Sequence, residues 1–412
     1  MIYRLEIENF CSIKHRQILD LSIAPNVPDP DDRYAALFPG STIRAPKVVA
    51  LYGANASGKT TTLKALDFLV RFTRDSATHG LATSGLVGFN DKDIEHEPIS
   101  FAVELAGLYD LGLFGLEESA STQDYATYRY EVSFKFDHQS AYVVFHEALR
   151  QRANGGGKWQ RVFERDADGS VKGSTAKPRN FPIAGYQHIV KTLPSDASLI
   201  STFAKFQHLG AQRLVHALIA VSTNLPYGRE GLGDGDVVRY LATSPKTLES
   251  LNRDLRRIDL GLEELRIEAT PNGPLAQFKH IGLPREMGWE RESHGTRAFI
   301  KMFPWLANTL ESGGIAIIDE FDAAIHPLLL PEILGWFYDS AYRNPFGAQI
   351  WMSCHSASLL DELTKEEVVL CEKNSSGQTE IFSLMDVEKV RRSDNLYRKY
   401  LSGVYGGVPN IG

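Results

Sequence analysis

The chain has 412 residues, of which 43% are hydrophobic and 23% are charged, and its formal net charge is −7. This length allows a large core and two or three structural units, whereas the negative charge excludes a protein that coats nucleic acid over its whole surface. Cys11, Cys354 and Cys371 are far apart and form no C-x-x-C pair, which argues against a disulfide framework and a zinc site. Because the chain lacks both a secretory leader and a run of about eighteen apolar residues, we expect a soluble, cytoplasmic protein without membrane contact.

Two strands with alternating polarity are predicted over 2–9 and 17–24, followed by a proline-rich, acidic loop over 25–33. A further apolar strand over 48–52 runs directly into Gly53-Ala54-Asn55-Ala56-Ser57-Gly58-Lys59-Thr60. The spacing is G-x-x-x-x-G-K-[ST], that of a phosphate-binding loop. In such a loop the glycines let backbone N–H groups surround phosphate oxygens, the lysine neutralises them, and the final hydroxyl ligates Mg²⁺.

The segment after this loop supports the same interpretation. A core-facing helix is expected over 61–74, and its N-terminus directs the positive end of the helix dipole towards the phosphates. The sequence therefore predicts a nucleoside triphosphate site with Mg²⁺, although these contacts do not distinguish ATP from GTP. The expected nucleotide contacts are Gly53, Asn55, Ala56, Ser57, Gly58, Lys59, Thr60 and Thr61, with Thr60 also a metal ligand.

The middle of the chain changes character. Short strands with turn-rich gaps predict an antiparallel sheet beside the nucleotide core, and they lie at 99–106, 128–136, 141–149 and 159–165. Helices over 194–224 and 234–258, separated by Pro226-Tyr227-Gly228, predict a short arm or lid. The basic region 150–179 fits either a solvated hairpin rim or a contact with nucleic acid phosphates.

Two apolar strands near the end of the chain each lead into polar residues. The run 315–318 ends in Asp319 and Glu320, at the carboxyl edge where ligands collect in parallel sheets. Asp319 would hold Mg²⁺, and Glu320 would polarise the attacking water. The run 349–354 leads to His355, which would hydrogen-bond the γ-phosphate or that water; a merely structural histidine is the alternative.

Between these elements, Glu292-Ser293-His294-Gly295-Thr296-Arg297 opens an apolar-periodic helix over 298–310. Hydroxyl residues and a glycine at a helix N-terminus form a second anion-binding surface. Taken alone, this segment is an ordinary helix cap.

The order of strand, phosphate loop, Ser293-His294-Gly295-Thr296, Ile318-Asp319-Glu320 and His355 resembles the ABC-type ATPase heads of the SMC, RecF and OLD group. It looks most like the compact AAA-family ATPases of bacterial abortive-infection and restriction-linked loci. The opening Asn9-Phe10-Cys11-Ser12 is similar to the N-F-R-S stretch of such heads, and the segment from Phe321-Asp322 to His326-Pro327 is similar to their acidic and D-loop region.

This resemblance implies an α/β fold, a P-loop NTPase head of the ABC type with a mixed central sheet flanked by helices, an antiparallel β subdomain and a short helical arm or lid. We place the N-terminal part of the head at 1–95, the β subdomain at 96–190, the arm at 191–261 and the C-terminal part of the head at 262–412. The resemblance also implies a head-to-tail homodimer, or a higher even-numbered oligomer. ATP would lie between Lys59 of one subunit and the signature segment of the other, with contacts from Ser293, Gly295 and Thr296.

The sequence departs from related heads at several positions. Cys11 stands where they often carry an arginine, and nearby Lys14 is a candidate replacement. The signature is Ser-His-Gly-Thr and not Leu-Ser-Gly-Gly-Gln. The candidates for a Q-loop glutamine remain open and are Gln123, Gln139, Gln151 and Gln160.

Three functions are open at this point. The first is a Mg²⁺-dependent regulatory ATPase of an anti-phage system that controls a separately encoded nuclease or toxin, because no acidic cluster for a two-metal nuclease follows Asp319. The aromatic, basic C-terminal segment would dock that effector, or would form a packed final helix. The second is a DNA-binding ATPase of repair or DNA maintenance. The third is a sensor that binds ATP with negligible turnover.

Overall fold

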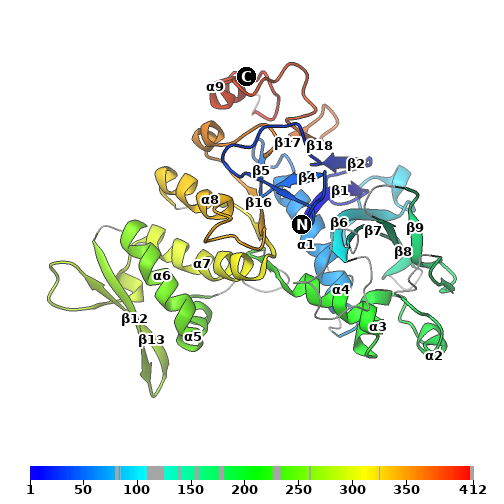
Figure 1. Cartoon of the computed structure of the whole chain (residues 1–412), viewed down its shortest axis with the longest axis horizontal. Coiled ribbons are helices and arrows are strands. Elements are labelled where there is room, and N and C mark those ends of the chain that lie inside the picture. Colours follow the sequence, from blue (N-terminus) through cyan, green and yellow to red (C-terminus); the bar gives the residue numbers. More distant parts are fainter. Residues whose placement is uncertain are drawn as a thin grey trace.

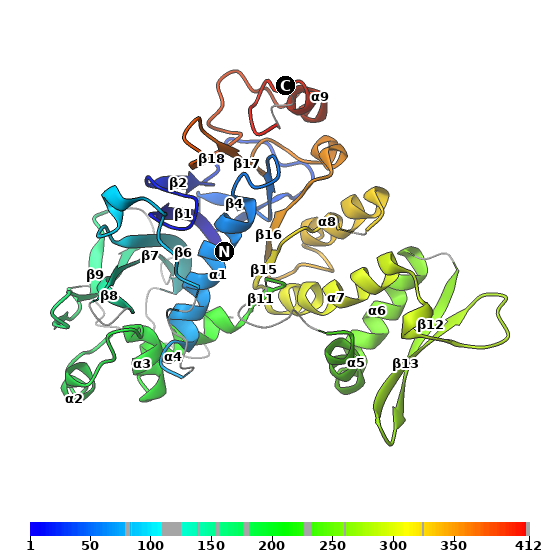
Figure 2. The same cartoon turned by 180° about the vertical axis from the view of Figure 1, so that it is seen from behind.

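The computed structural model describes residues 1–78, 83, 85–108, 125–137, 141–153, 157–175, 181–225, 233–258, 261–323 and 325–408. A central sheet has an antiparallel sheet on one side, and a smaller group of helices and strands projects on the other side (Figure 1). The view from behind shows the same arrangement (Figure 2).

The central sheet has the strand order β11-β15-β16-β5-β17-β18 within the described residues. Strands β11 to β17 in this order are parallel, and β18 pairs with β17 in the antiparallel direction. Their bounds are β11 Val221–Thr223, β15 Ile315–Ile318, β16 Gln349–Ser353, β5 Val48–Tyr52, β17 Val368–Lys373 and β18 Thr379–Ser383. Every residue of β5, β15 and β16 is buried, as expected for parallel strands that are covered on both faces.

Side chains of β5 alternate between two hydrophobic cores. Val49 and Leu51 belong to the core that contains α1 (Lys59–Asp75), whereas Val48, Ala50 and Tyr52 belong to the core that contains α7 (His294–Ser312) and α8 (Leu330–Tyr338). Successive residues of a strand point to opposite faces of its sheet. The central sheet therefore separates two apolar layers, and the carboxyl ends of its strands are left at one edge.

The antiparallel sheet has the strand order β10-β9-β8-β7-β6-β1-β2. Its bounds are β10 Val171–Lys172, β9 Gln160–Arg165, β8 Tyr142–Ala153, β7 Tyr125–Phe136, β6 Ile99–Leu108, β1 Ile2–Glu8 and β2 Gln17–Asp20. The two N-terminal strands extend this sheet because β1 pairs with β6, with Leu5 opposite Val103. The predicted α/β fold, with a mixed central sheet, flanking helices and an antiparallel sheet, is confirmed.

The helices expected as one arm over 191–261 lie in two places. Helices α2 (Gln187–Lys191), α3 (Leu199–Lys205) and α4 (Leu209–Ile219) are on the side of α1, and Phe203 joins the α1 core. Helices α5 (Asp234–Thr243) and α6 (Pro245–Ile258) bury Leu251 and Leu255 in the α7 core. Each group has its own apolar face, and the two faces pack on opposite sides of the central sheet. Residues 226–228, which were predicted to separate the two helices of the arm, lie outside the described residues.

Helices α5 and α6 pack against a small sheet to form the peripheral lobe, which comprises α5, α6 and β12 to β14. This sheet contains β12 (Leu262–Thr270), β13 (Gly273–His280) and β14 (Met287–Gly288). The lobe projects away from the antiparallel sheet in both views (Figures 1 and 2). The remaining short elements are β3 Tyr34–Ala36, β4 Arg44–Pro46, η1 Lys92–Ile94, η4 Trp289–Arg291, η5 Pro327–Leu329 and η6 Ala357–Glu362.

The C-terminal segment packs against the start of the phosphate-binding loop. Helix α9 (Leu396–Leu401) places the Tyr400 ring 5.8 Å from the Tyr52 ring, measured between centroids. The Tyr400 hydroxyl donates to the carbonyl oxygen of Gly407 (3.1 Å), whose N–H donates to Glu372 (3.0 Å). Of the two expectations for this segment, the structure shows the packed helix, over residues 396–401. No helix in the described part of the chain is both long and apolar enough to span a membrane.

Candidate nucleotide-binding site

The phosphate-binding loop has a backbone that requires glycine at two positions. Gly53 has φ +152°, and a Cβ atom there would lie 2.2 Å from the carbonyl oxygen of Cys371. Gly58, which caps α1, has φ +115°, and a Cβ atom there would lie 2.4 Å from the methyl group of Thr379. Left-handed backbone is accessible to glycine without a steric cost. These two residues therefore permit the tight loop between β5 and α1.

Two hydroxyl residues from other parts of the chain hold this loop in place. Thr379, the first residue of β18, donates its hydroxyl to the carbonyl oxygen of Ser57 (2.9 Å) and its N–H to that of Ser12 (2.8 Å). The Ser12 and Thr379 hydroxyls are also hydrogen-bonded, at 2.8 Å. The sequence did not predict this contact, because no local pattern marks a threonine that binds a loop more than 300 residues away.

The loop contains polar groups that suit a phosphate. Lys59 is buried, with 5% of the residue exposed. Its ammonium group donates to the carbonyl oxygens of Gly53 (2.8 Å) and Ala54 (3.1 Å). Burial lowers the pKa of Lys59, while nearby groups that include Asp319 act in the opposite direction. The buried hydroxyl oxygen of Ser57 has no hydrogen-bond partner among the described residues. A bound phosphate would supply the negative charge and the acceptor oxygens that these groups lack.

Thr60 and Asp319 are separated by 259 residues but lie side by side. Asp319 follows β15, at the carboxyl edge of the central sheet, and its Oδ1 atom accepts from the Thr60 hydroxyl (3.2 Å) and from the Ser353 hydroxyl (2.5 Å). Asn224 fixes the Asp319 backbone by donating to its carbonyl oxygen (2.8 Å) and accepting from its N–H (2.7 Å). A carboxylate and a hydroxyl are hard oxygen ligands, so the pair fits Mg²⁺.

Glu320 and His355 lie at the same cavity as the phosphate-binding loop. Glu320 has φ +51°, a conformation rare for residues other than glycine, and its N–H donates to the Ser353 hydroxyl (2.8 Å). The N–H of His355 donates to Asp322 (2.9 Å). The cavity has a volume of about 910 Å³, within the range of small-molecule sites. It is lined by Ser12, Asn55, Ala56, Ser57, Gly58, Lys59, Thr60, Thr61, Glu320, Asp322, Ala323 and His355.

Not every predicted contact lines this cavity. Gly53 lies against the backbone of Cys371. Asp319 contacts Thr60, which lines the cavity, but does not line the cavity itself. Conversely, Ser12 and Asp322 line the cavity although neither was named as a site residue. Both stand in stretches that resemble related heads, and that resemblance was the signal that could have found them.

The signature segment is separate from the cavity in this chain. Ser293 caps α7 by accepting from the N–H of Thr296 (3.0 Å), and Ser293 and His294 are exposed. Buried Glu292 supports this cap: it accepts from the N–H of Ser293 (2.7 Å) and lies 2.8 Å from the half-buried His280 of β13. Within the described residues, neither Ser293 nor Thr296 lines the cavity.

The structure also places the residues at which the sequence departs from related heads. Lys14 forms an ion pair with Asp91 (2.5 Å) and does not line the described cavity, so it does not replace the missing arginine there. Of the Q-loop candidates, Gln151 is buried in β8 and Gln160 begins β9, and neither is a cavity residue. The other two candidates, Gln123 and Gln139, lie outside the described residues.

Part of the basic region 150–179 is neutralised inside the antiparallel sheet. Arg165 is 3% exposed, lies 3.7 Å from Glu147 and donates to two backbone carbonyl oxygens. Lys177 and Arg179 lie outside the described residues. The pairing of Arg165 favours the structural interpretation of this basic residue over a phosphate contact.

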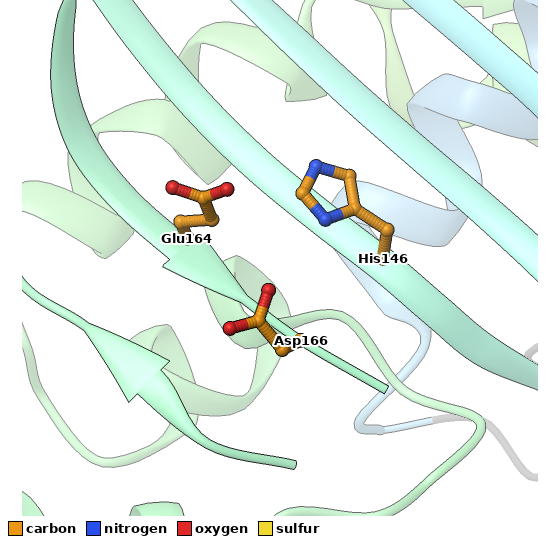
Figure 3. Close-up of side chains that lie close together, drawn as sticks. All are labelled: His146, Glu164 and Asp166. Atoms are coloured by element: carbon orange, nitrogen blue, oxygen red, sulfur yellow. The ribbon is translucent and has the colours of Figure 1, made fainter. Parts of the chain in front are cut away.

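A group of metal-ligand side chains lies in the same sheet. His146 of β8 and Glu164 and Asp166 at the end of β9 point towards one another (Figure 3), with one ligand atom from each within 4.8 Å of the others. Lys172 lies 2.6 Å from Asp166, and Arg161 lies 3.7 Å from Glu164. A divalent cation would have to displace these basic groups, so we assign no metal to this cluster.

Comparisons with known proteins add to this geometry. The family model described as "AAA domain, putative AbiEii toxin, Type IV TA system" matches residues 48–182 and 198–361, well over half of the chain. Among solved structures, the chain is similar to the SMC head domain from Thermotoga maritima, with 13% identity, a TM-score of 0.41, and coverage of 93% of this chain and 98% of that chain. A comparison with curated proteins finds no match. The family match spans the phosphate-binding loop, Asp319 and His355, and from it we conclude that the chain belongs to the family of AAA domains described as putative AbiEii toxin, type IV toxin–antitoxin system.

Proposed function

We propose that this protein binds ATP with Mg²⁺ and hydrolyses it to ADP and phosphate. The observation that carries the proposal is the meeting of Lys59, Thr60, Glu320 and His355 at one cavity, with Asp319 bonded to Thr60. These residue types are those that phosphoryl transfer to water requires: a phosphate cradle, oxygen ligands for the metal and a base for the water.

Each residue has a distinct part in this proposal. Lys59 and the loop N–H groups bind the phosphates, and Thr60 and Asp319 hold Mg²⁺, which when bound neutralises charge between the phosphates. Glu320 polarises the attacking water, and His355 hydrogen-bonds the γ-phosphate or that water. The Ser353 hydroxyl holds the carboxylate of Asp319 and the backbone N–H of Glu320.

We further propose that ATP joins two copies of the chain head to tail. Ser293 and His294 of the signature segment are exposed, and the segment does not line the described cavity of its own chain, so a second copy would have to bring it to the phosphates. The N-terminus of α7 would then direct its positive dipole end at the γ-phosphate. Hydrolysis would remove this shared contact and release the two copies.

The nucleotide state would in turn control a separately encoded effector, a nuclease or toxin, in an anti-phage system. The printed family description, with its toxin–antitoxin association, supports this biological context. A DNA-maintenance ATPase is the alternative. The ion pairs within the region 150–179 do not favour it.

The first experiment tests hydrolysis. Glu320→Gln should lower the hydrolysis rate by about a hundredfold or more while ATP binding is retained, because the amide cannot accept the proton of the water. Lys59→Ala should instead weaken ATP binding by about tenfold or more, because it removes a charged phosphate contact. Glu311→Gln, at an exposed position of α7, is the control for the loss of one carboxylate.

If the Glu320→Gln variant hydrolyses ATP at the wild-type rate, Glu320 does not polarise the attacking water. Wild-type protein that binds ATP without turnover would support the sensor function instead. GTP competition against labelled ATP measures the base preference. Strong stimulation of turnover by duplex DNA, with binding that weakens steeply as salt rises, would favour the DNA-maintenance alternative.

A further inference from the structure

Asp322 connects the two loops that carry the proposed catalytic residues. It lies two residues after Glu320, in the loop that follows β15, and its carboxylate reaches the loop that follows β16. One oxygen atom, Oδ2, accepts hydrogen bonds from two successive backbone N–H groups, those of His355 (2.9 Å) and Ser356.

The neighbouring contacts explain why this carboxylate matters for His355. The strand ladder holds the preceding residues, since Cys354 donates its N–H to Leu51 (3.0 Å) and Ser353 accepts one from Phe321 (3.0 Å). The side chain of Cys354 is fully buried, whereas that of His355 is exposed at the cavity. The chain therefore leaves the packed sheet at His355, and Asp322 holds the backbone at that point.

We propose that Asp322 is a positioning residue that fixes the backbone of His355 and so directs its imidazole into the nucleotide cavity. This inference rests on the proposed ATPase function. Hydrogen bonds to a charged acceptor are stronger than neutral ones, and two of them on a single oxygen restrain both peptide planes. The interaction also ties the loop of Glu320 to that of His355, so the proposed base and the proposed phosphate sensor keep one relative placement.

A different function for Asp322 has to be separated from this one, because its carboxylate also lines the cavity. If its negative charge acted on the metal or on water, asparagine would be as damaging as alanine. If it acts as an acceptor for the two N–H groups, asparagine retains a carbonyl oxygen that can accept both. Asp322→Asn and Asp322→Ala therefore discriminate the two functions.

The experiment compares these variants with His355→Ala. We expect Asp322→Ala to lower kcat about tenfold with KM for ATP nearly unchanged, and Asp322→Asn to stay within about threefold of the wild type. The double variant of Asp322→Ala and His355→Ala should be no slower than His355→Ala alone, because both changes remove the same imidazole from the site. Hydrogen–deuterium exchange of the nucleotide-free protein should be faster at residues 355–356 in Asp322→Ala than in Asp322→Asn.

Asp168→Ala is the matched control, because this carboxylate also accepts a backbone N–H, from Ser170 (2.8 Å), but lies in the turn between β9 and β10. It should change exchange locally and leave kcat unaltered. Equal loss of kcat in the asparagine and alanine variants would overturn the inference, and so would additive effects with His355→Ala or unchanged exchange at 355–356. A wild-type protein without turnover would refute the proposed function. The exchange comparison would still test whether Asp322 restrains the backbone at residues 355–356.

Discussion

The side chain of Ser353, the last residue of β16, has no solvent exposure, and its hydroxyl lies between the two acids of the site. It donates to Asp319 (2.5 Å) and accepts from the N–H of Glu320 (2.8 Å). We expect Ser353→Ala to cost about 1–3 kcal/mol of unfolding free energy, since it leaves the N–H of Glu320 unsatisfied. Hydrolysis should fall by about tenfold or more with ATP binding retained, as measured by steady-state turnover and calorimetric titration.

Ser383→Ala is the control for this prediction. Ser383 is equally buried, ends β18 of the same sheet and accepts one N–H, from Met385 (3.1 Å), and it does not line the cavity. The control should be destabilised to a similar extent but should keep its turnover. Loss of activity in both variants would mean that general destabilisation accounts for the Ser353 result.

The glycine requirement of the phosphate-binding loop gives a second prediction. Gly53→Ala forces a Cβ atom to within 2.2 Å of the Cys371 carbonyl oxygen, so the loop must shift, and both ATP affinity and the melting temperature should fall. Gly335→Ala in α8 meets no atom within 4 Å and should stabilise the protein by up to about 1 kcal/mol. Thermal melts with and without ATP check both variants. An unaltered melt for Gly53→Ala would contradict the described loop geometry.

The sequence identified the residues of the site that belong to local patterns. The phosphate-binding loop follows an apolar strand, and Asp319 and Glu320 follow another, so each could be located from its own neighbourhood. Asn224, Ser353 and Thr379 carry no such pattern. Their polar groups find hydrogen-bond partners only because the fold brings distant strands together. A single sequence does not show which strands pair.

At the scale of elements, β1 provides an acid that joins several arginines of the antiparallel sheet. The Glu6 carboxylate is 4% exposed and accepts from Arg129 (2.7 and 2.9 Å), Arg4 (2.9 Å) and Arg16. Burial alone would raise the pKa of Glu6, but the three guanidinium groups outweigh it and lower the pKa to about 2. The folded state therefore binds a proton at Glu6 less readily than the unfolded chain does.

This depressed pKa predicts a pH-dependent contribution to stability. Above the ordinary pKa of 4.5 the ionised Glu6 stabilises the fold, by at most about 3 kcal/mol, and this contribution is lost as the pH falls towards 2. We expect Glu6→Gln to reduce the unfolding free energy most at pH 7 and to have little effect near pH 2. Urea unfolding at several pH values measures this difference, with the exposed Glu268→Gln as control. A difference that is constant with pH would contradict the prediction.

The elements predicted from an apolar period are mostly present, but the helix expected over 194–224 is divided into α3 and α4, and its residues 221–223 form β11. Their association was not predictable. The period of β1 is compatible with either sheet, and the pairing with β6 decides between them. Similarly, the apolar faces of α3 and α6 predict that each helix is packed, but do not reveal that they join different cores. A prediction of one helical arm followed from their closeness in sequence alone.

For the whole molecule, the proposed dimer makes a prediction about self-association. On the Glu320→Gln background, ATP should convert a monomer into a dimer, and ADP should not, as measured by light scattering after size-exclusion chromatography. Adding Gly295→Asp should abolish this dimer, because it places a carboxylate opposite the triphosphate. The new acid stands in the first turn of α7, where it favours the helix dipole, so the fold itself should not suffer.

Gly235→Asp is the matched control for the dimer. Gly235 is the second residue of α5, as Gly295 is of α7, but it belongs to the peripheral lobe. The control should dimerise with ATP as the parent does. Dimerisation of both variants would show that the signature segment does not face a shared nucleotide, and the proposed head-to-tail arrangement would fail.

The side chain of Asn224 connects the end of β11 to the loop that carries Asp319. Asn224 follows β11 at the edge of the central sheet and precedes the chain that leads to the peripheral lobe. Its side chain forms hydrogen bonds with both the carbonyl oxygen and the N–H of Asp319. Any displacement of Asn224 would therefore shift the backbone of Asp319, the acid that we propose as a Mg²⁺ ligand.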